Sequence, residues 1–330
     1  MWPSSWRPSI RRRRADSVAE GPPAAFVALP DRAVLSVTGA PRLKFLHNIL
    51  SNDVESLKPG QGRRAALMDV KGHLLAFVRV LADADAVRLE VAGDRREAVE
   101  QALVHYRVAT PVRFAARPDV VLGLVGPEAR GALAAAGAEV PELEEEGHVR
   151  AHLGGVEIEV ARAGDLPGRG YVLHVPPQGT EAVAAALRAA GAIALSAPSL
   201  DALRVESGRP WYGPDVTEEN LLHETGLLRE YHSPTKGCYV GQEVVARLDA
   251  RGGHVNKLMR GLRLTSPAAA GSTVTAEGKD VGRVTTAAIS SRLGPVALAY
   301  VHRSRADPGS VVEVAGSPAT VVALPFGEAG

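Results

Sequence analysis

The sequence predicts an α+β protein of more than one domain that ends in a small antiparallel β-barrel. The chain has 330 residues, which is more than a single hydrophobic core usually serves. Segments with strand and helix patterns alternate through most of the chain, as in an α+β layer. After Leu264, short alternating stretches separated by turns replace the helices. This last pattern is typical of a small barrel.

The composition is that of an ordinary globular protein, with 45% hydrophobic and 23% charged residues. A formal net charge of +1 gives no general attraction to nucleic acid or to a membrane surface. The single cysteine excludes an intramolecular disulfide and cannot by itself hold a zinc ion or an iron–sulfur cluster. We therefore predict no resident metal site.

Residues 1–26 are expected to form a disordered basic tail, because Arg11–Arg14 are followed by a polar, Pro-rich tract and not by an apolar signal region. An over-extended start, a nucleic-acid arm and a transit peptide are the alternatives. No apolar stretch approaches the roughly 20 residues of a spanning helix, so membrane insertion is not expected. We predict a cytoplasmic protein.

The first folded block begins with a β-rich run, Val34–Val37, and a Gly-Ala-Pro turn that leads into a helix. The apolar stripe of this helix is Phe45, Leu46, Ile49 and Leu50. Strands follow on both sides of Lys71-Gly72. The stretch "DRREAVEQALVHY" is then expected to be a helix with Asp94 as its cap and Glu97 in the capping-box position.

A second block of similar pattern contains two Ala-rich helices, in "GPEARGALAAAG" and "GTEAVAAALRAAG". The acidic stretch "PELEEEGHV" between them is expected to be a solvated loop. The barrel strands are expected in "STVTAEGKDVGRVTTAAIS", "GPVALAYVHR" and "GSVVEVAGSPATVVALPF".

The only cysteine lies in "SPTKGCYVGQEVVAR", before a predicted amphipathic helix that begins near Gly241. Unpaired amides at the start of that helix, together with Lys236, favour the thiolate form of Cys238. A reactive or metal-contacting thiol is therefore one interpretation. The alternative is a small buried hydrophobic residue, since free cysteines are among the most buried residue types.

The stretch "KGCYVGQE" resembles the signature K-G-C-Y-x-G-Q-E of the YgfZ family, folate-binding proteins that are similar to the glycine cleavage T-protein, an aminomethyltransferase. Other stretches share the resemblance: "VTGAPRLKFLHNILSNDV", "LRVESGRPWYGPDVTEENLLHE", "VGRVTTAAISSRLGPVALAYV" and the closing "LPF". It covers residues 27 to 326. An eight-residue match that includes Cys, Tyr and Gln is far more specific than a lone glycine pattern.

The resemblance implies a three-domain ring around a folate-binding channel, with tetrahydrofolate or a derivative as ligand. A discontinuous folate-binding α+β domain would comprise residues 27–116 and 196–246. Residues 117–195 would form an inserted α+β domain, and residues 247–330 the barrel. The functional thiol would be Cys238, with the motif residues Lys236, Gly237, Tyr239, Gly241, Gln242 and Glu243 around it.

The motif residues also allow physical expectations. Gly237 and Gly241 would permit a close approach of the backbone to a ligand. Gln242 offers both a donor and an acceptor to a pterin edge. Glu243 either shares this role or pairs with Arg247 on the helix surface.

Five further residues are candidates for folate contacts, and four of them have a structural alternative. Asn52 and Asp53 would face the channel or simply end the helix in a turn. Arg204 and Glu206, two apart on an expected strand, would meet the glutamyl tail and a polar partner or form an internal ion pair. Tyr212 lies in a turn beside that strand.

For three other residues near these stretches, a structural role is favoured over ligand or metal binding. Trp211 is expected to pack and not to stack on a ligand. His223 and His232 flank the loop before Cys238, but their spacing matches no standard zinc pattern, so solvation or helix packing is expected.

The chain departs from the T-protein pattern at positions where the T-protein has acidic residues. Its catalytic aspartate lies in a G-G-x-x-D-D-like strand, whereas "GHLLAFV" has Ala76 and Phe77 at those positions. Gly168, in "RAGDLPGRG", replaces the glutamate that recognises the pterin. Without these carboxylates aminomethyl transfer loses its main electrostatic help, so the chain is not expected to be an active aminomethyltransferase.

The resemblance therefore implies a folate-binding accessory protein that supports assembly or repair of iron–sulfur clusters in client enzymes, including enzymes that modify tRNA. The expected partners are folate and iron–sulfur client or assembly proteins, with a transient cluster shared with such a partner. Folate-dependent aminomethyl or methyl transfer is the alternative. Direct binding of nucleic acid through the arginine tail is a third hypothesis, and it is not favoured.

Overall fold

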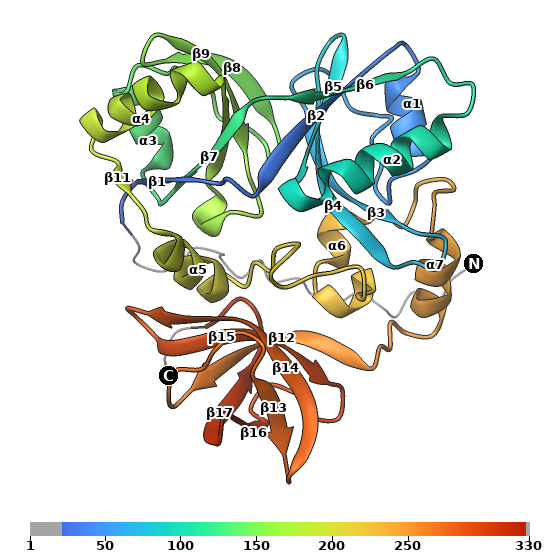
Figure 1. The fold of residues 1–330 in the computed structure, drawn as a ribbon, viewed down its shortest axis with the longest axis vertical. Helices are drawn as coiled ribbons and strands as arrows, with labels where there is room; N and C mark the ends of the chain where they lie inside the picture. The colour runs from blue at the N-terminus through green and yellow to red at the C-terminus, as the bar shows by residue number, and fades with distance from the viewer. Residues whose placement is uncertain (1–21, 328–330) are drawn as a thin grey trace, which may run out of the picture.

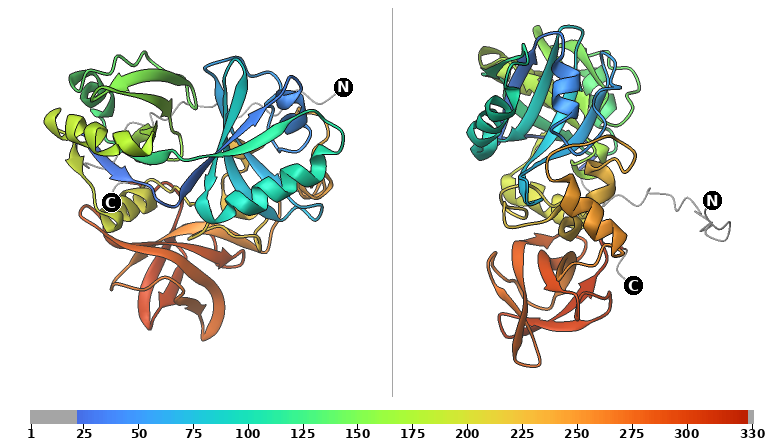
Figure 2. Two further views of the ribbon diagram at one scale, coloured as in Figure 1. Left: turned by 45° about the horizontal axis from the view of Figure 1, so that its top comes forward. Right: turned by 90° about the vertical axis from the view of Figure 1, so that its right-hand side faces the viewer.

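The structure, a computed structural model, describes residues 22–327. Two α/β units and a closed barrel lie around a common centre (Figure 1). A view turned by 90° shows the barrel at one end and the α/β units at the other, with the helices that follow the second unit between them (Figure 2). The predicted α+β fold with a C-terminal antiparallel barrel is confirmed.

The first unit is a five-stranded antiparallel sheet in the order β3-β4-β5-β2-β6. Its elements are β2 (Arg32–Thr38), α1 (Arg42–His47), β3 (Gly62–Met68), β4 (Leu74–Ala82), β5 (Ala86–Ala92), η1 (Gly93–Arg95), α2 (Arg96–Arg107) and β6 (Arg113–Arg117). The α1 helix ends before Ile49 and Leu50, but both are buried in the same core as Phe45.

The two faces of this sheet pack against different parts of the molecule. Because side chains alternate along a strand, Ala76, Val78 and Val80 of β4 point to the core beneath α1 and α2. Their neighbours Phe77 and Arg79 point to the opposite face, which is also buried. The strand therefore shows no apolar-polar alternation, and its second face brings a charged side chain to the centre of the molecule.

The second unit is a six-stranded sheet in the order β11-β1-β7-β10-β9-β8. Its elements are β1 (Ala25–Ala28), β7 (Val120–Val125), α3 (Ala129–Ala135), β8 (His148–Leu153), β9 (Val156–Arg162), η2 (Pro167–Arg169), β10 (Tyr171–Val175), η3 (Pro177–Gly179), α4 (Thr180–Ala189) and β11 (Ile193–Ala194). One face packs on α3 and α4, and the other packs toward the first sheet through residues such as Val121 and Leu81.

A connecting segment follows the second unit and runs to the barrel. It contains α5 (Ala197–Glu206), η4 (Leu222–Thr225), α6 (Leu228–Tyr231) and α7 (Gln242–Ala250). The α5 helix packs on the barrel strands β14 and β15. The barrel consists of β12 (Lys257–Leu264), β13 (Thr273–Ala276), β14 (Lys279–Ser290), β15 (Gly294–His302), β16 (Val311–Val314) and β17 (Ser317–Val322), and it closes because β12 pairs with both β15 and β17.

The structure corrects two local predictions. Arg204 and Glu206 lie on α5 and not on a strand. Ser196 caps this helix by accepting a hydrogen bond from the Ser199 amide, and a proline occupies its first turn, which is a favourable helix start. The capping box at Asp94 is also wrong. Asp94 belongs to η1, α2 begins at Arg96, and no side chain caps it.

Some predicted boundaries also shift. The predicted tail of residues 1–26 ends too late, because β1 begins at Ala25, where pairing with β7 and β11 buries the chain. Arg11–Arg14 lie outside the described residues. The expected division between residues 246 and 247 falls inside α7, and the division after residue 116 falls inside β6. Across residues 22–327, no helix is long and apolar enough to cross a membrane.

Candidate functional site

Cys238 is exposed, in the loop between α6 and α7. The alternative of a buried hydrophobic residue is therefore wrong. Lys236 anchors the same loop, because its Nζ donates to the carbonyl oxygens of His47 and Leu50, the latter at 2.6 Å. These carbonyls lie at the C-terminal end of α1, where a cation is favoured. The thiol is thus presented to solvent from a tethered loop.

Lys236 is itself partly buried. Burial lowers the pKa of Lys236 to about 8, and the nearby acidic groups Asp53 and Cys238 oppose that shift. Its Nζ also lies 4.7 Å from the centre of the Tyr239 ring. The Tyr239 ring is buried, and burial raises the pKa of its hydroxyl. The motif therefore places a partly buried lysine and an exposed thiol on the same loop.

The start of α7 explains one motif glycine. Gly241 has a φ of 83°, and a Cβ there would lie 2.7 Å from the carbonyl oxygen of Asp69. Gly72 faces the same helix, since a Cβ on it would lie 2.8 Å from the Cβ of Val244. These glycines let α7 pack directly on the turn between β3 and β4. Gly237 has open space around it, so sterics do not explain it.

The remaining motif residues lie on the first turn of α7. Glu243 pairs with Arg247 at 2.6 Å on the exposed helix surface, which is the surface alternative considered for it. Gln242 is half-buried at the first position of the helix. Its role as a ligand contact stays a prediction.

Asn52 and Asp53 have local partners. The Asn52 amide nitrogen donates to the Arg64 carbonyl oxygen at 2.8 Å, and its oxygen accepts from the Asp53 amide at 2.9 Å. Asp53 accepts from the Ser56 hydroxyl at 2.7 Å and lies 3.1 Å from His47 Nδ1. These contacts are the turn chemistry that was the alternative to a folate role.

Arg204, Glu206 and Tyr212 are also satisfied within the protein. Arg204 is fully buried, and its guanidinium donates to Asp215, to Asp201 at 3.0 Å and to the Thr286 hydroxyl at 2.9 Å. Glu206 lies 3.4 Å from Arg292. The Tyr212 hydroxyl donates to the Leu74 carbonyl oxygen at 3.0 Å. Internal pairing, the alternative for Arg204, is what the structure shows.

The two histidines and Trp211 have the structural surroundings that the sequence analysis favoured over ligand or metal binding. His223 Nε2 lies 2.9 Å from Asp249, at the far end of α7. Burial lowers the pKa of His232. The Trp211 indole donates to the Asp165 carbonyl oxygen at 3.2 Å, and its ring packs beneath Arg32. Within residues 22–327, no group of three or more His, Cys, Asp or Glu side chains is placed to hold a metal ion.

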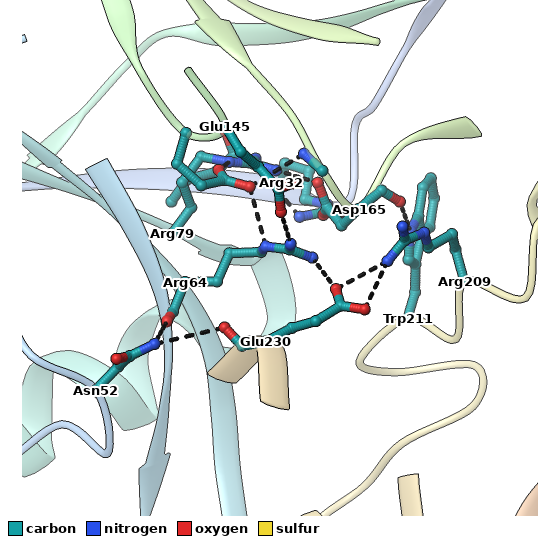
Figure 3. Close-up of polar contacts among 12 residues, drawn as sticks. Arg32, Asn52, Arg64, Arg79, Glu145, Asp165, Arg209, Trp211 and Glu230 are labelled. Atoms are coloured by element: carbon teal, nitrogen blue, oxygen red, sulfur yellow. Dashed lines mark hydrogen bonds and ion pairs between the residues drawn. The ribbon is translucent and has the colours of Figure 1, made fainter. Parts of the chain in front are cut away.

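The main site feature that sequence reasoning missed is a cluster of charges between the two sheets (Figure 3). We call it the central charge cluster. Its members come from both sheets, from the loops before β8 and after β9, and from the connecting segment: Arg32, Arg64, Arg79, Glu90, Glu145, Glu146, Asp165, His174, Arg209 and Glu230.

Arg79 is the buried hub of this cluster, with 3% of its surface exposed. It donates to Glu146 at 2.6 Å, to Glu90 at 2.5 Å and to Asp165. Burial alone would raise the pKa of Glu90, but Arg79, His174 and Arg32 outweigh it and lower that pKa to about 2. Glu90 is therefore a buried carboxylate held in its charged form.

The outer half of the cluster is partly accessible. Arg64 donates to Glu145 and to Glu230, the latter at 2.5 Å, and its Nε lies 3.0 Å from Glu146. Arg209 contacts the same Glu230 carboxylate at 2.8 Å and 2.9 Å. The Glu145 side chain is 46% exposed and the Glu230 side chain 32%. This half is the part of the cluster that solvent reaches through Glu145 and Glu230.

The acidic loop was predicted to be solvated, and this is wrong for Glu146. Glu146 is buried, has a φ of 63°, and accepts from the Gly164 amide at 3.0 Å besides its two arginines. A signal for the cluster was present in the strands. Arg79 and Glu90 are charged residues inside apolar runs, "AFVRVLA" and "VRLEVA", and such residues need buried partners.

The positions that were expected to lack acids are apolar. Ala76 faces the core beneath α1 and α2, and Phe77 stacks on Tyr231 with 4.2 Å between ring centres. Gly168 has a φ of 66° and offers no side-chain group. The centre of the molecule is thus rich in arginine–carboxylate pairs but has no carboxylate at these three positions.

The architecture is thus two α/β units joined by a helical segment to a closed six-stranded barrel. Comparison with known proteins identifies the family that has this architecture. The model of the GCVT N-terminal domain matches residues 31–231, and that of the glycine cleavage T-protein C-terminal barrel domain matches residues 257–327. The chain belongs to the glycine cleavage T-protein family.

Its curated relatives include aminomethyltransferases and YgfZ proteins. An aminomethyltransferase of Streptomyces coelicolor is 29% identical over 95% of this chain and 89% of its own length. The tRNA-modifying protein YgfZ of Yersinia enterocolitica is 27% identical over 72% of this chain and 70% of its own. The predicted relationship to YgfZ proteins is therefore confirmed.

A solved structure, the glycine cleavage system aminomethyltransferase T from Bartonella henselae, superposes with a TM-score of 0.83. It covers 92% of this chain and 86% of its own, at 23% identity. At that identity the likeness establishes the shared fold. The function of this chain depends on its own site.

Proposed function

We propose that this protein binds a folate and supports the assembly or repair of iron–sulfur clusters in client enzymes, including enzymes that modify tRNA. The observation that carries the proposal is the exposed Cys238 thiol on a loop tethered by Lys236. A thiol placed outside the hydrophobic core, with a cation beside it, suits contact with a partner's cluster, thiol or oxidised group. The site of action would be cytoplasmic.

The charges at the centre fit a folate's carboxylates. Both Arg64, which is 4% exposed, and Arg209, which is 25% exposed, have their guanidinium groups in the outer half of the cluster. A guanidinium fork matches the geometry of a carboxylate, and folate carries such groups on its glutamyl end. The pterin end has less support, because Gly168 replaces the acid that the family uses there. Gln242 remains the candidate for the pterin edge.

A permanently held iron–sulfur cluster does not fit the described residues. Cys238 supplies one thiolate ligand, and clusters ordinarily need several. A cluster would instead be cargo, with its other ligands coming from a client or assembly protein. Lys236 would keep the loop in place and supply a positive charge beside the thiolate.

Aminomethyl or methyl transfer is the second candidate, since a relative 29% identical to this chain is named aminomethyltransferase. The apolar side chains at Ala76 and Phe77 argue against it, because they leave no carboxylate to polarise the donor. A purified protein that transfers one carbon to tetrahydrofolate would establish the transferase and displace the accessory role.

The decisive experiment compares wild type with Cys238→Ala in anaerobic maturation of an iron–sulfur client, with tetrahydrofolate titrated calorimetrically into both. We expect both proteins to bind tetrahydrofolate and only wild type to restore the client. Glu243→Gln is a matched control, because it changes an exposed motif residue without touching the thiol. Full activity of Cys238→Ala would refute the thiol role, and absence of folate binding by both would refute the folate role.

A further inference from the structure

We propose that Arg64 is a carboxylate-binding site and that Glu145 is its internal occupant, which a glutamyl carboxylate of the ligand displaces. The inference rests on the proposed folate binding for the identity of the ligand. The contact between Arg64 and Glu145 itself is a feature of this structure (Figure 3). We call Glu145 a latch, because it would compete with the ligand's carboxylate for Arg64 and so lower the affinity of the protein for that ligand.

Arg64 has more carboxylate partners than its single charge requires. Glu145, Glu146 and Glu230 all contact its guanidinium, and its side chain is only 4% exposed. Glu146 is also bound by Arg79, and Glu230 is also bound by Arg209. These two acids therefore remain paired whatever happens at Arg64.

Glu145 differs from both in being replaceable. Within residues 22–327, its side chain forms no ion pair or hydrogen bond except with Arg64. It is also the most exposed of the three, so its carboxylate can regain water when it leaves. The buried Arg64 is not left unpaired by the exchange, because the incoming carboxylate replaces the one that leaves.

The rest of the site is held in place. Glu146, the next residue, is fixed by the Gly164 amide and by Arg79, so that a swing of Glu145 does not require the loop to move. Arg64 keeps its bond to Glu230 and lies over the Tyr231 ring, 5.4 Å from the ring centre. Only the Nη2 group of Arg64 is freed by the exchange.

Gly164 shows how closely a carboxylate fits this position. A Cβ on Gly164 would lie 2.4 Å from Glu145 Oε1 and 2.7 Å from Arg64 Nη2. The ion pair thus lies directly against the backbone of Gly164. A ligand carboxylate, similar in size to that of Glu145, would take the same position beside Arg64.

The chemistry favours a carboxylate over a phosphate. Two other acids, Glu146 and Glu230, remain at Arg64 after Glu145 leaves. A dianionic phosphate would meet their repulsion with twice the charge, whereas a carboxylate restores the original charge balance. The glutamyl end of a folate supplies that group.

The test uses N-(4-aminobenzoyl)-L-glutamate, the tail half of folate, titrated calorimetrically into the full chain. We expect Glu145→Gln to bind it about two- to fivefold more tightly than wild type, the factor that corresponds to removal of a competing carboxylate that is half-exposed to water. Glu144→Gln is the matched control, because it removes one charge from the exposed neighbouring residue. Arg64→Lys in the Glu145→Gln background should remove the gain.

Equal affinities of Glu145→Gln and Glu144→Gln for the tail fragment would overturn the latch. The loss of one negative charge anywhere in this loop would then explain the effect. Tetrahydrofolate titrations of the same proteins separate this result from the proposed function. Tetrahydrofolate binding with no effect of Glu145→Gln would reject the latch and keep folate binding. A Glu145-specific gain for the tail fragment, with no tetrahydrofolate binding, would keep the Arg64 site and reject folate as its ligand.

Discussion

Arg79 of β4 and Glu146 of the loop before β8 form a buried ion pair, with 2.6 Å between Nε and Oε2. The pair joins the first sheet to the second unit. Both residues are at least 96% buried, so neither charge has water as an alternative partner. The contact is one of several that hold the two units together, with the Arg64–Glu145 pair and the packing of Leu81 on the second unit.

Replacing Arg79 by Met is expected to destabilise the protein by about 3–5 kcal/mol or more, because three buried carboxylates would lose a shared partner. Urea unfolding followed by circular dichroism measures the change. Arg117→Met is the control, since Arg117 pairs with Asp119 from a partly exposed position. It should cost less than about 1 kcal/mol. Equal costs for the two variants would show that the cluster does not hold the units together.

Acid should weaken the fold through Glu90. Its pKa is about 2 in the folded protein and 4.5 is its ordinary value, so the unfolded chain takes up the proton first as pH falls. The contribution of Glu90 is complete above pH 4.5 and is lost as pH approaches 2, for a total of roughly 3 kcal/mol. Unfolding free energies measured across this range test it. Glu90→Gln should show a shallower pH dependence than wild type, and an unchanged slope would contradict the assignment.

Gly241→Ala should destabilise the protein by about 1–3 kcal/mol, because a non-glycine residue is strained at a φ of 83° and its Cβ would approach the Asp69 carbonyl oxygen. Gly237→Ala is the matched control in the same motif, since nothing lies within 4 Å of the added Cβ. Thermal unfolding compares the two. If Gly237→Ala proves the more harmful variant, the packing of α7 on the β3–β4 turn is not what the motif glycine serves.

Cys238 should react as a surface thiol. We expect the native protein to give one equivalent of thiol with a chromogenic disulfide reagent, without denaturant, because the residue is exposed. Cys238→Ala should abolish the reaction and leave the free energy of unfolding within about 0.5 kcal/mol of wild type. A thiol that reacts only after unfolding would contradict both the exposure and the proposed role.

The parts of the fold that were predicted correctly depend on local patterns. The barrel follows from short alternating strands, and α7 follows from the helical spacing of its apolar residues. The α5 helix was missed because two charged residues two apart suggest one face of a strand. The Ser196 cap and the proline in the first turn were the stronger signals.

The candidate site was predictable only in part. The Cys238 motif is contiguous, so the sequence alone locates it. The central charge cluster joins residues such as Arg64 and Glu230, which are 166 positions apart, and nothing local pairs them. Long-range partners of this kind follow from tertiary packing, and the acidic loop was misjudged for the same reason.

The place of β1 in the second sheet has a consequence for synthesis of the chain. Ala25 leaves the ribosome early, but its partners on β7 and β11 follow the whole first unit. The first unit can therefore fold while β1 is still unpaired. The second sheet is complete only after Ile193 has emerged. A nascent chain stalled between the two units should accordingly expose Phe26 to chaperones, whereas the released protein buries it.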